Sequence, residues 1–197
     1  MKDNLEVDEY LKLGDTPCSN EEVMATFIFS CYTGLRWVDV KRMKWANIKE
    51  NFLTTRIIQA KTKLPVTLTL HPVAASILKT QRAKLESLFP RLREFVFRLP
   101  TPTGTNNILK QWMATAGIDK HITWSCARLS FSILLQDKNV DDATVAYLME
   151  HSTTEHVRKT YKRHRPKSQS ETISHLPSPN KTLPFFDSSI STEGFAS

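Results

Sequence analysis

Glycine is scarce in this chain: only five of the 197 residues are glycine. Nucleotide-binding loops of the Rossmann and P-loop types need closely spaced glycines, because their backbone approaches the phosphates without side chains in the way. Five glycines spread over the whole chain leave no such cluster. The sequence therefore excludes both of these nucleotide-binding classes.

Cysteine is also scarce, with three residues at Cys18, Cys31 and Cys126. No two of them have the C-x-x-C spacing of a zinc ribbon, and three widely spaced cysteines do not make a disulfide framework. We therefore expect no metal site, and a reducing cytosol is the simplest setting for the protein.

Long apolar segments are missing as well. No apolar run approaches the roughly 20 residues of a membrane-spanning helix. The first fifteen residues, MKDNLEVDEYLKLGD, carry too many charges for a signal peptide. We therefore expect a cytoplasmic protein with no membrane partner.

Acidic residues are fewer than basic ones, with 20 Asp and Glu against 27 Lys and Arg, a formal charge of +7. Hydrophobic residues make up 40% of the chain, which is typical of a folded domain. An excess of positive charge suits a polyanionic partner, although many ordinary domains are basic too. Charge alone therefore indicates nucleic acid as one candidate among several.

Hydrophobic periodicity predicts a mainly helical chain with one short β region, which is the α+β class. A capping-box pattern at Ser19–Glu22 begins the first predicted helix, and Thr33-Gly34 ends it. A small antiparallel sheet follows, with Lys61 and Lys63 at the tip of its hairpin. The predicted helices cover 20–33, 37–43, 71–87, 104–116, 123–137, 141–149 and 153–163, and the predicted strands cover 45–48, 53–59 and 65–70. Residues 1–18 show no clear element, and the chain beyond residue 166 is rich in Ser, Thr and Pro.

Two arginines lie at positions that favour binding of a phosphate group. Arg36 falls at the break between two predicted helices, and its guanidinium can bind two phosphate oxygens at once. A surface arginine is the alternative. Arg128 lies in an otherwise apolar helix and shares a face with Ser125 and Phe131. A charge there needs a ligand or a structural ion pair.

A histidine and a tyrosine complete the candidate set. His151 lies at a predicted helix-to-loop junction, where a capping or surface role is the alternative. Tyr161 lies among basic residues, which favour the phenolate that a nucleophile needs. The alternative is a basic surface helix with one packed aromatic residue.

In this order and spacing, the blocks resemble the tyrosine recombinase (phage integrase) family, and specifically its catalytic domain. Thr33-Gly34-Leu35-Arg36, with Asp39 and then Trp45, is similar to the family's T-G-L-R-x-x-D/E box. The remaining matches are Gln59–Lys63 with the hairpin lysine, Thr123–Phe131 with the H-x-x-R box, Leu148–Thr153 with the L-G-H-S box, and Tyr161 with the nucleophile. The amino-acid sequence of the first box is most similar to that of integrases from bacterial conjugative and mobilisable transposons.

The resemblance implies a catalytic domain at 19–166, preceded by a lead-in at 1–18 and followed by a flexible tail at 167–197 that carries a candidate protomer-contact segment. The core-binding domain that precedes this domain in the family is expected to be absent. The resemblance also implies that the partners are double-stranded DNA and other recombinase protomers, in the nucleoid of a bacterial cytoplasm. No cofactor is implied, because the phosphotyrosyl bond stores the energy of the cleaved DNA bond.

The resemblance further implies a role for each matched residue. Tyr161 attacks the scissile phosphate to give a 3′-phosphotyrosyl link. Arg36 and Arg128 bind the non-bridging oxygens, and His151 hydrogen-bonds one of them. Lys61 protonates the departing 5′-oxygen, and its distance from the strand end favours it over Lys63. Asp39 orients Arg36, or is a plain helix charge. The flanking DNA backbone is assigned to Lys63, Arg158, Lys159, Lys162 and Arg163.

This chain departs from the family pattern at Ser125, which stands where the family has the histidine of H-x-x-R. A serine hydroxyl donates one hydrogen bond but does not exchange a proton near neutral pH. Glu150 and Leu129 also replace the usual glycine and second histidine. We therefore expect an active recombinase whose activity Ser125 weakens. The alternative is a catalytically impaired copy that binds DNA or has a regulatory role.

Overall fold

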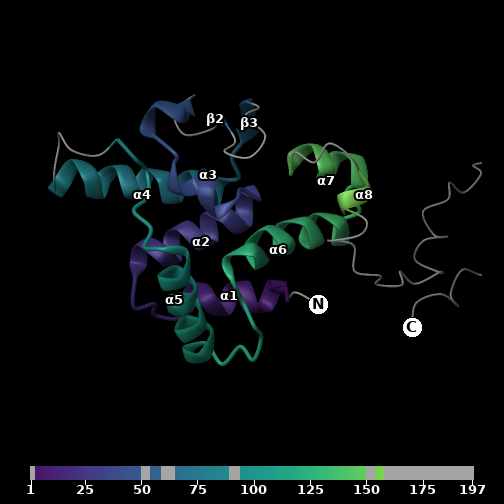
Figure 1. Ribbon diagram of the computed structural model, residues 1–197, viewed down its shortest axis with the longest axis horizontal. Coiled ribbons are helices and arrows are strands. Elements are labelled where there is room, and N and C mark those ends of the chain that lie inside the picture. Colours follow the sequence, from purple (N-terminus) through teal and green to yellow (C-terminus); the bar gives the residue numbers. More distant parts are fainter. Residues whose placement is uncertain (1–2, 50–53, 59–64, 89–93, 150–153, 158–197) are drawn as a thin grey trace, which may run out of the picture. The chain divides into compact units, whose positions relative to one another are not determined.

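The computed structural model describes residues 3–49, 54–58, 65–88, 94–149 and 154–157 (Figure 1). Its helices are α1 (Val7–Asp15), α2 (Glu21–Thr33), α3 (Trp37–Lys41), α4 (Pro72–Leu88), α5 (Pro102–Thr115), α6 (Trp124–Asp137), α7 (Asp142–Leu148) and α8 (Thr154–His156). Its strands are β1 (Ile48–Lys49), β2 (Thr54–Ile58) and β3 (Pro65–Thr69), preceded by the 3-10 turn η1 (Trp45–Asn47). The predicted α+β class, mainly helical with a small antiparallel sheet, is confirmed.

Helix α2 lies at the centre of the described helices and packs against α4, α5 and α6 (Figure 1). It begins at Asn20, whose side chain accepts a hydrogen bond from the Val23 N–H at 2.9 Å. This differs from the predicted cap at Ser19 by one residue. Most of the helix is apolar because it is buried on more than one side, as expected for a central helix. Phe27 belongs to one hydrophobic cluster and Phe29 to another.

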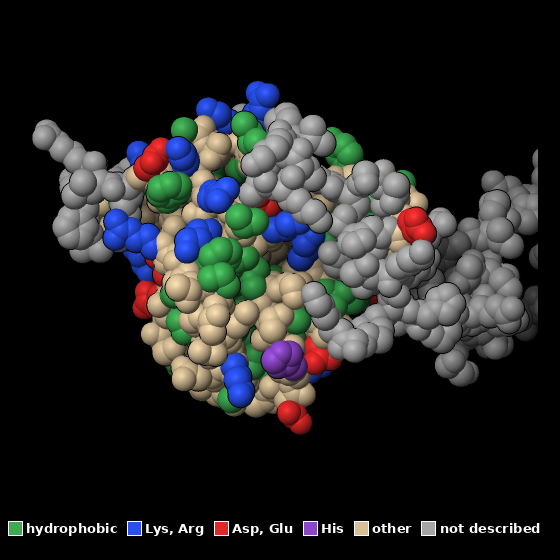
Figure 2. Space-filling model, viewed as in Figure 1, with side chains coloured by type: hydrophobic (Ala, Val, Ile, Leu, Met, Phe, Trp, Pro, Cys, Tyr) green, Lys and Arg blue, Asp and Glu red, His purple; other side chains and the backbone are tan. Residues whose placement is uncertain are grey.

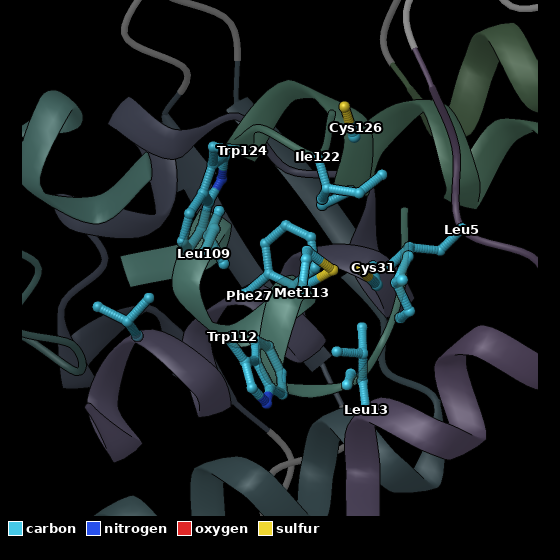
Figure 3. Packing of buried hydrophobic residues seen from close by; sticks show 14 of the residues in the cluster. Leu5, Leu13, Phe27, Cys31, Leu109, Trp112, Met113, Ile122, Trp124 and Cys126 are labelled. Carbon is cyan, nitrogen blue, oxygen red and sulfur yellow. The ribbon is translucent and has the colours of Figure 1, made fainter. Parts of the chain in front are cut away.

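The first cluster joins α2 to α5 and α6 (Figure 3). Phe27 makes edge-to-face contacts with Trp112 and Trp124, at ring-centroid distances of 6.2 and 5.6 Å. Such contacts stabilise a core beyond the burial of their area. The Trp112 indole N–H donates to the Thr16 carbonyl at 2.9 Å, so this buried polar group is satisfied.

The second cluster lies between α2, α4 and the sheet. The strands are antiparallel in the order β1-β2-β3, and Thr55 pairs with Leu68. Ile57 and Leu68 pack against Val40 and Met43, which follow the α2–α3 break. The sheet therefore holds α3 in place, and with it the part of the predicted block that contains Asp39.

The expectation of no element over residues 1–18 is wrong, because this segment contains α1. Its start is capped by Glu6 and Glu9, whose carboxylate accepts from the Glu6 N–H at 2.7 Å. Leu5 and Leu13 are fully buried in the first cluster, whereas Val7 and Leu11 are exposed. Helix α1 has only nine residues, fewer than the roughly 11–18 residues over which helical periodicity is read.

The strand predicted over 45–48 is instead mostly the turn η1, with β1 beginning at Ile48. The other predicted helices and strands match the observed ones to within a few residues. Helix α8 covers the start of the predicted 153–163 helix, and residues from 158 onward lie outside the described part. The division into 1–18, 19–166 and 167–197, and the absence of a core-binding domain, stay predictions. Among the described residues, no helix is both long and apolar enough to cross a bilayer.

Candidate active site

Arg36 lies at the break between α2 and α3, as predicted. Helix α2 ends at Gly34, which adopts the left-handed conformation with φ 66° and ψ 8°. Arg36 is extended and serves as the N-cap residue of α3, and its carbonyl accepts from the Asp39 and Val40 N–H groups at 3.0 Å each. The half-buried Arg36 side chain therefore leaves the backbone at a rigid corner.

Gly34 is required at this corner for two physical reasons. The left-handed conformation disfavours residues that carry a Cβ. A Cβ built on Gly34 would also lie 2.6 Å from Cδ1 of Phe131, which is closer than real Cβ contacts come. Because Phe131 belongs to α6, the turn before Arg36 is in direct contact with the helix that carries Arg128.

Arg128 is buried, with 7% of its surface exposed. Its Nη1 donates to the Gly34 carbonyl, and its Nη2 donates to the Met149 carbonyl. Gly34 is the C-cap of α2 and Met149 is the C-cap of α7. Helix C-termini carry partial negative charge from their unpaired carbonyls. Two helix ends therefore stabilise a guanidinium whose burial would otherwise cost several kcal/mol.

These two hydrogen bonds bring three of the predicted blocks together. Gly34 is two residues before Arg36, and Met149 is two residues before the predicted His151. Arg128 supplies the third block and binds the backbone of the other two. The N-terminus of α6 is itself fixed, because the Trp124 N–H donates to the Asn106 side chain at 2.9 Å.

A third hydrophobic cluster joins α6 to the α7 region and to Val157. Val145 and Met149 of the α7 region pack with the fully buried Val157, and Phe131 lies against them. Val157 is four residues before Tyr161 in the sequence. Phe131 therefore contacts both the Gly34 turn and the cluster from which the chain continues to Tyr161.

Asp39 is buried, with 4% of its surface exposed, on the first turn of α3. Its backbone N–H is bonded to the Arg36 carbonyl at 3.0 Å, so the two residues belong to one turn. This location differs from that of a solvated helix charge. Orientation of Arg36 by Asp39 stays a prediction.

Ser125 is exposed on the first turn of α6, three residues before Arg128. Its Oγ lies 3.0 Å from Oγ1 of Thr123, the N-cap residue of that helix. Either hydroxyl can donate in this pair. The side chain that replaces the expected histidine therefore lies at the open end of the helix that holds Arg128.

The other predicted site residues lie outside the described part of the chain. They are Lys61, Lys63, His151, Arg158, Lys159, Tyr161, Lys162 and Arg163.

The acceptors of Arg128 are missed by sequence reasoning. They are backbone carbonyls, which every residue has, so no residue type marks them. The one usable signal is Gly34 itself, since a glycine at a helix end indicates a left-handed C-cap and a turned-out carbonyl.

A groove of about 550 Å³ lies between α3 and residues 94–99. Trp37 and Phe97 line it, and its charged residues are Lys41, Arg42, Arg98 and Glu94. Lysine and arginine side chains also gather over the upper half of the face shown in Figure 2. The described part of the chain has no group of three or more His, Cys, Asp or Glu side chains suited to a metal ion.

Of the three cysteines, Cys31 and Cys126 are buried and Cys18 is half-buried, and all three are free thiols. Burial raises the pKa of the Cys31 thiol from its ordinary 9.0 to about 12. Cys31 therefore stays protonated at neutral pH and is a packing residue, not a nucleophile.

Comparisons with known proteins give consistent results. Residues 3–168 match the model of the phage integrase family. No protein with a curated description matches the sequence. The fold is similar to that of XerA recombinase, with a TM-score of 0.74 and 16% identity over 91% of this chain and 67% of that one.

Two DNA complexes are also similar in fold. The Tn1549 transposon integrase, in complex with a circular intermediate DNA, has a TM-score of 0.72 and 12% identity over 89% of this chain and 66% of that one. The XerH site-specific recombinase, bound to its difH substrate, has a TM-score of 0.69 and 19% identity over 87% of this chain and 54% of that one. The chain thus spans between about half and two thirds of these proteins, and at such identities the likeness shows the fold alone. With the family match covering most of its length, the chain belongs to the phage integrase family.

Proposed function

We propose that this protein is a site-specific DNA recombinase that cuts and rejoins DNA through a phosphotyrosine intermediate. The observation that carries the proposal is the buried Arg128, bonded to Gly34 and Met149. These bonds gather the turn before Arg36 and the C-terminal end of α7, two residues before His151 in the sequence, around one guanidinium. Membership of the phage integrase family supplies the reaction class.

In the proposed reaction, the phenolic oxygen of Tyr161 attacks the phosphorus of one DNA strand. A Tyr161–phosphate bond forms, the bond between phosphorus and the 5′-oxygen breaks, and Lys61 gives a proton to that oxygen. The phenolic proton passes to solvent or to a neighbouring base. A 5′-hydroxyl of another strand then reverses the step, so no external energy source is needed.

Arg36 and Arg128 are proposed to bind the non-bridging oxygens as charge develops on them, with His151 as a further donor. Phosphoryl transfer depends mainly on such positioning and charge stabilisation. The rigid corner at Arg36 and the two helix ends around Arg128 support this role. The Arg128 guanidinium is held by two backbone carbonyls before any substrate binds, so it requires little reorganisation.

Ser125 is proposed to slow the reaction, because its hydroxyl replaces a group that exchanges protons near neutral pH. Its exposed position next to the N-terminus of α6 leaves room for an imidazole in the variant Ser125→His. We expect this variant to cleave faster than the parent protein.

The proposed partners are double-stranded DNA and further copies of the protein. Solved structures with this fold include a lambda integrase dimer bound to a core site and XerH bound to difH. The basic residues Lys63, Arg158, Lys159, Lys162 and Arg163 are proposed to contact the DNA backbone beside the cleavage point. Binding should therefore weaken steeply as salt is raised.

A covalent-capture experiment tests the proposal even though the DNA site is not specified in advance. The full chain is incubated with a pool of nicked duplexes whose sequence around the nick is randomised. After cleavage the short fragment beyond the nick diffuses away, so the adduct is trapped. Adducts that survive denaturing electrophoresis are sequenced, and the enriched duplex is then resynthesised.

The matched variants are Tyr161→Phe and Tyr147→Phe. Tyr147 lies on α7 with 78% of its surface exposed, so its hydroxyl is a control for the loss of a tyrosine nearby in the sequence. We expect the adduct with the parent and with Tyr147→Phe, and none with Tyr161→Phe. An adduct that persists in Tyr161→Phe contradicts the nucleophile assignment. Salt-dependent DNA binding without any adduct, in the parent and in Ser125→His, would show a binding-only copy instead.

A further inference from the structure

The segment before α1 is fastened to the helix that carries Arg128. We call residues 3–6 the N-terminal strap. The backbone N–H of Leu5 donates to the Ser130 Oγ of α6 at 2.8 Å, across 125 residues of sequence. The Leu5 side chain is fully buried in the cluster that contains Cys126 and Ala127 of the same helix.

The strap is also fastened to the loop that precedes α6. Lys120 Nζ donates to the Asn4 carbonyl at 3.1 Å and to a Glu9 carboxylate oxygen at 2.6 Å. The His121 N–H donates to the Asp3 carboxylate at 3.0 Å. Both the body of α6 and the chain leading into it are therefore held by the same short segment.

Ser130 and Arg128 lie on opposite sides of α6. Two residues along an α-helix correspond to a rotation of about 200°. Ser130 accepts from Leu5 and donates to the Cys126 carbonyl of its own helix at 2.9 Å, so its hydroxyl is engaged on the side of the strap. Arg128 points the other way, toward Gly34 and Met149.

We propose that Ser130 is a positioning residue for DNA cleavage, through which the docked N-terminal strap holds Arg128 against the carbonyls of Gly34 and Met149. This inference rests on the proposed function. Helix α6 is pressed between the strap on one side and the two helix ends on the other. Release of the strap lets the helix shift, and a small shift at Arg128 misplaces the group that binds the phosphate.

The chain offers a matched pair of substitutions on one helix. Ser130 and Ser132 are both fully buried on α6. The Oγ of Ser132 has no hydrogen-bond partner within the part of the chain that the structure describes, whereas the Oγ of Ser130 binds the strap. Ser130→Ala and Ser132→Ala therefore remove the same atom from the same helix, but only the first removes the hydrogen bond from Leu5.

A second pair tests the strap from its other attachment. Lys120→Met keeps the aliphatic length of the side chain but removes the bonds to Asn4 and Glu9. Lys110→Met, at an exposed position of α5, is its control. If both attachments act through one strap, the double variant Ser130→Ala/Lys120→Met should lose less of the adduct-formation rate than the two single losses combined predict.

The measurements are the single-turnover rate of adduct formation at saturating DNA, the Kd for the same duplex, and the Tm. All are taken at a temperature where circular dichroism shows every variant folded. We expect Ser130→Ala to form the adduct about tenfold more slowly than Ser132→Ala, with an unchanged Kd. Equal rates for the two serine variants overturn the proposal, as does a rate loss matched by an equal loss of DNA binding. If Ser130→Ala does not fold, the same comparison is made between Lys120→Met and Lys110→Met.

Amide hydrogen exchange separates this inference from the proposed function. The N–H groups of Gly34 and Met149 are both hydrogen-bonded, to Ser30 and Val145. We expect both to exchange faster in Ser130→Ala than in Ser132→Ala. An absent adduct in the parent, together with this difference, would reject the recombinase function and keep the strap. Equal exchange in the two variants would reject the strap, whatever the parent does to DNA.

Discussion

Replacing Gly34 with alanine removes two features of the turn before Arg36 at once. Alanine in the left-handed conformation, here φ 66°, costs about 1–2 kcal/mol. The new Cβ would also lie 2.6 Å from Cδ1 and 2.9 Å from Cε1 of Phe131. Overpacking of a buried contact typically costs about 1–3 kcal/mol more. We therefore expect Gly34→Ala to lower the free energy of unfolding by roughly 2–5 kcal/mol.

Gly117 provides the control, because it shares the conformation but not the contact. Its φ is 64°, and the nearest atom to a built Cβ is Lys12 Nζ at 3.4 Å, an ordinary van der Waals distance. Gly117→Ala should therefore cost only the conformational part, about 1–2 kcal/mol. The difference between the two variants measures the contact of the turn with Phe131.

Equilibrium urea unfolding of the full chain measures both values. Phe131→Leu in the Gly34→Ala background should recover part of the loss, because the shorter side chain withdraws from the new Cβ. A Gly34→Ala protein no less stable than Gly117→Ala would refute the reasoning. So would a double variant in which Phe131→Leu brings no recovery.

Three further predictions concern stability and thiol chemistry. The pKa of Cys31 is 9.0 in the unfolded chain and about 12 in the folded chain, so the folded state holds this proton more tightly. The free energy of unfolding should therefore fall by up to about 1.4 kcal/mol per pH unit above pH 9. Cys31→Ala should reduce this slope, as measured by urea unfolding at several pH values. Alkylation under native conditions, followed by mass spectrometry, should modify the half-buried Cys18 first, and the buried Cys31 and Cys126 only after unfolding; equal labelling of all three would contradict the burial. Asn20→Ala should destabilise the protein by about 1 kcal/mol in thermal unfolding, because the Val23 N–H loses its cap, whereas Ser19→Ala should have little effect.

The sequence predicts α2 well because local chemistry marks both of its ends. Asn20 caps the start and Gly34 ends it, with apolar residues between them. Helix α1 is not predicted because its nine residues are too few for helical periodicity to be read with the usual window, and because Leu11 is 69% exposed whereas Leu13 is buried. Only the tertiary structure decides which of them faces the core.

The candidate site, too, is predictable from the sequence only in part. Arg36 is correctly placed at a helix break, and Arg128 is correctly expected on the buried side of its helix. The partners of Arg128 are not predictable, because Gly34 and Met149 contribute only carbonyls. Their selection depends on where α2 and α7 end in space, which is a property of the whole fold.

The bonds of Arg128 also have a consequence for the order in which the protein is made. Its acceptors lie 94 residues before it and 21 residues after it in the chain. A ribosome therefore delivers Gly34 early and Met149 last, and the guanidinium cannot complete both bonds until α7 has been synthesised and folded. The environment that stabilises the buried Arg128 is thus completed only after the C-terminal end of α7 has formed.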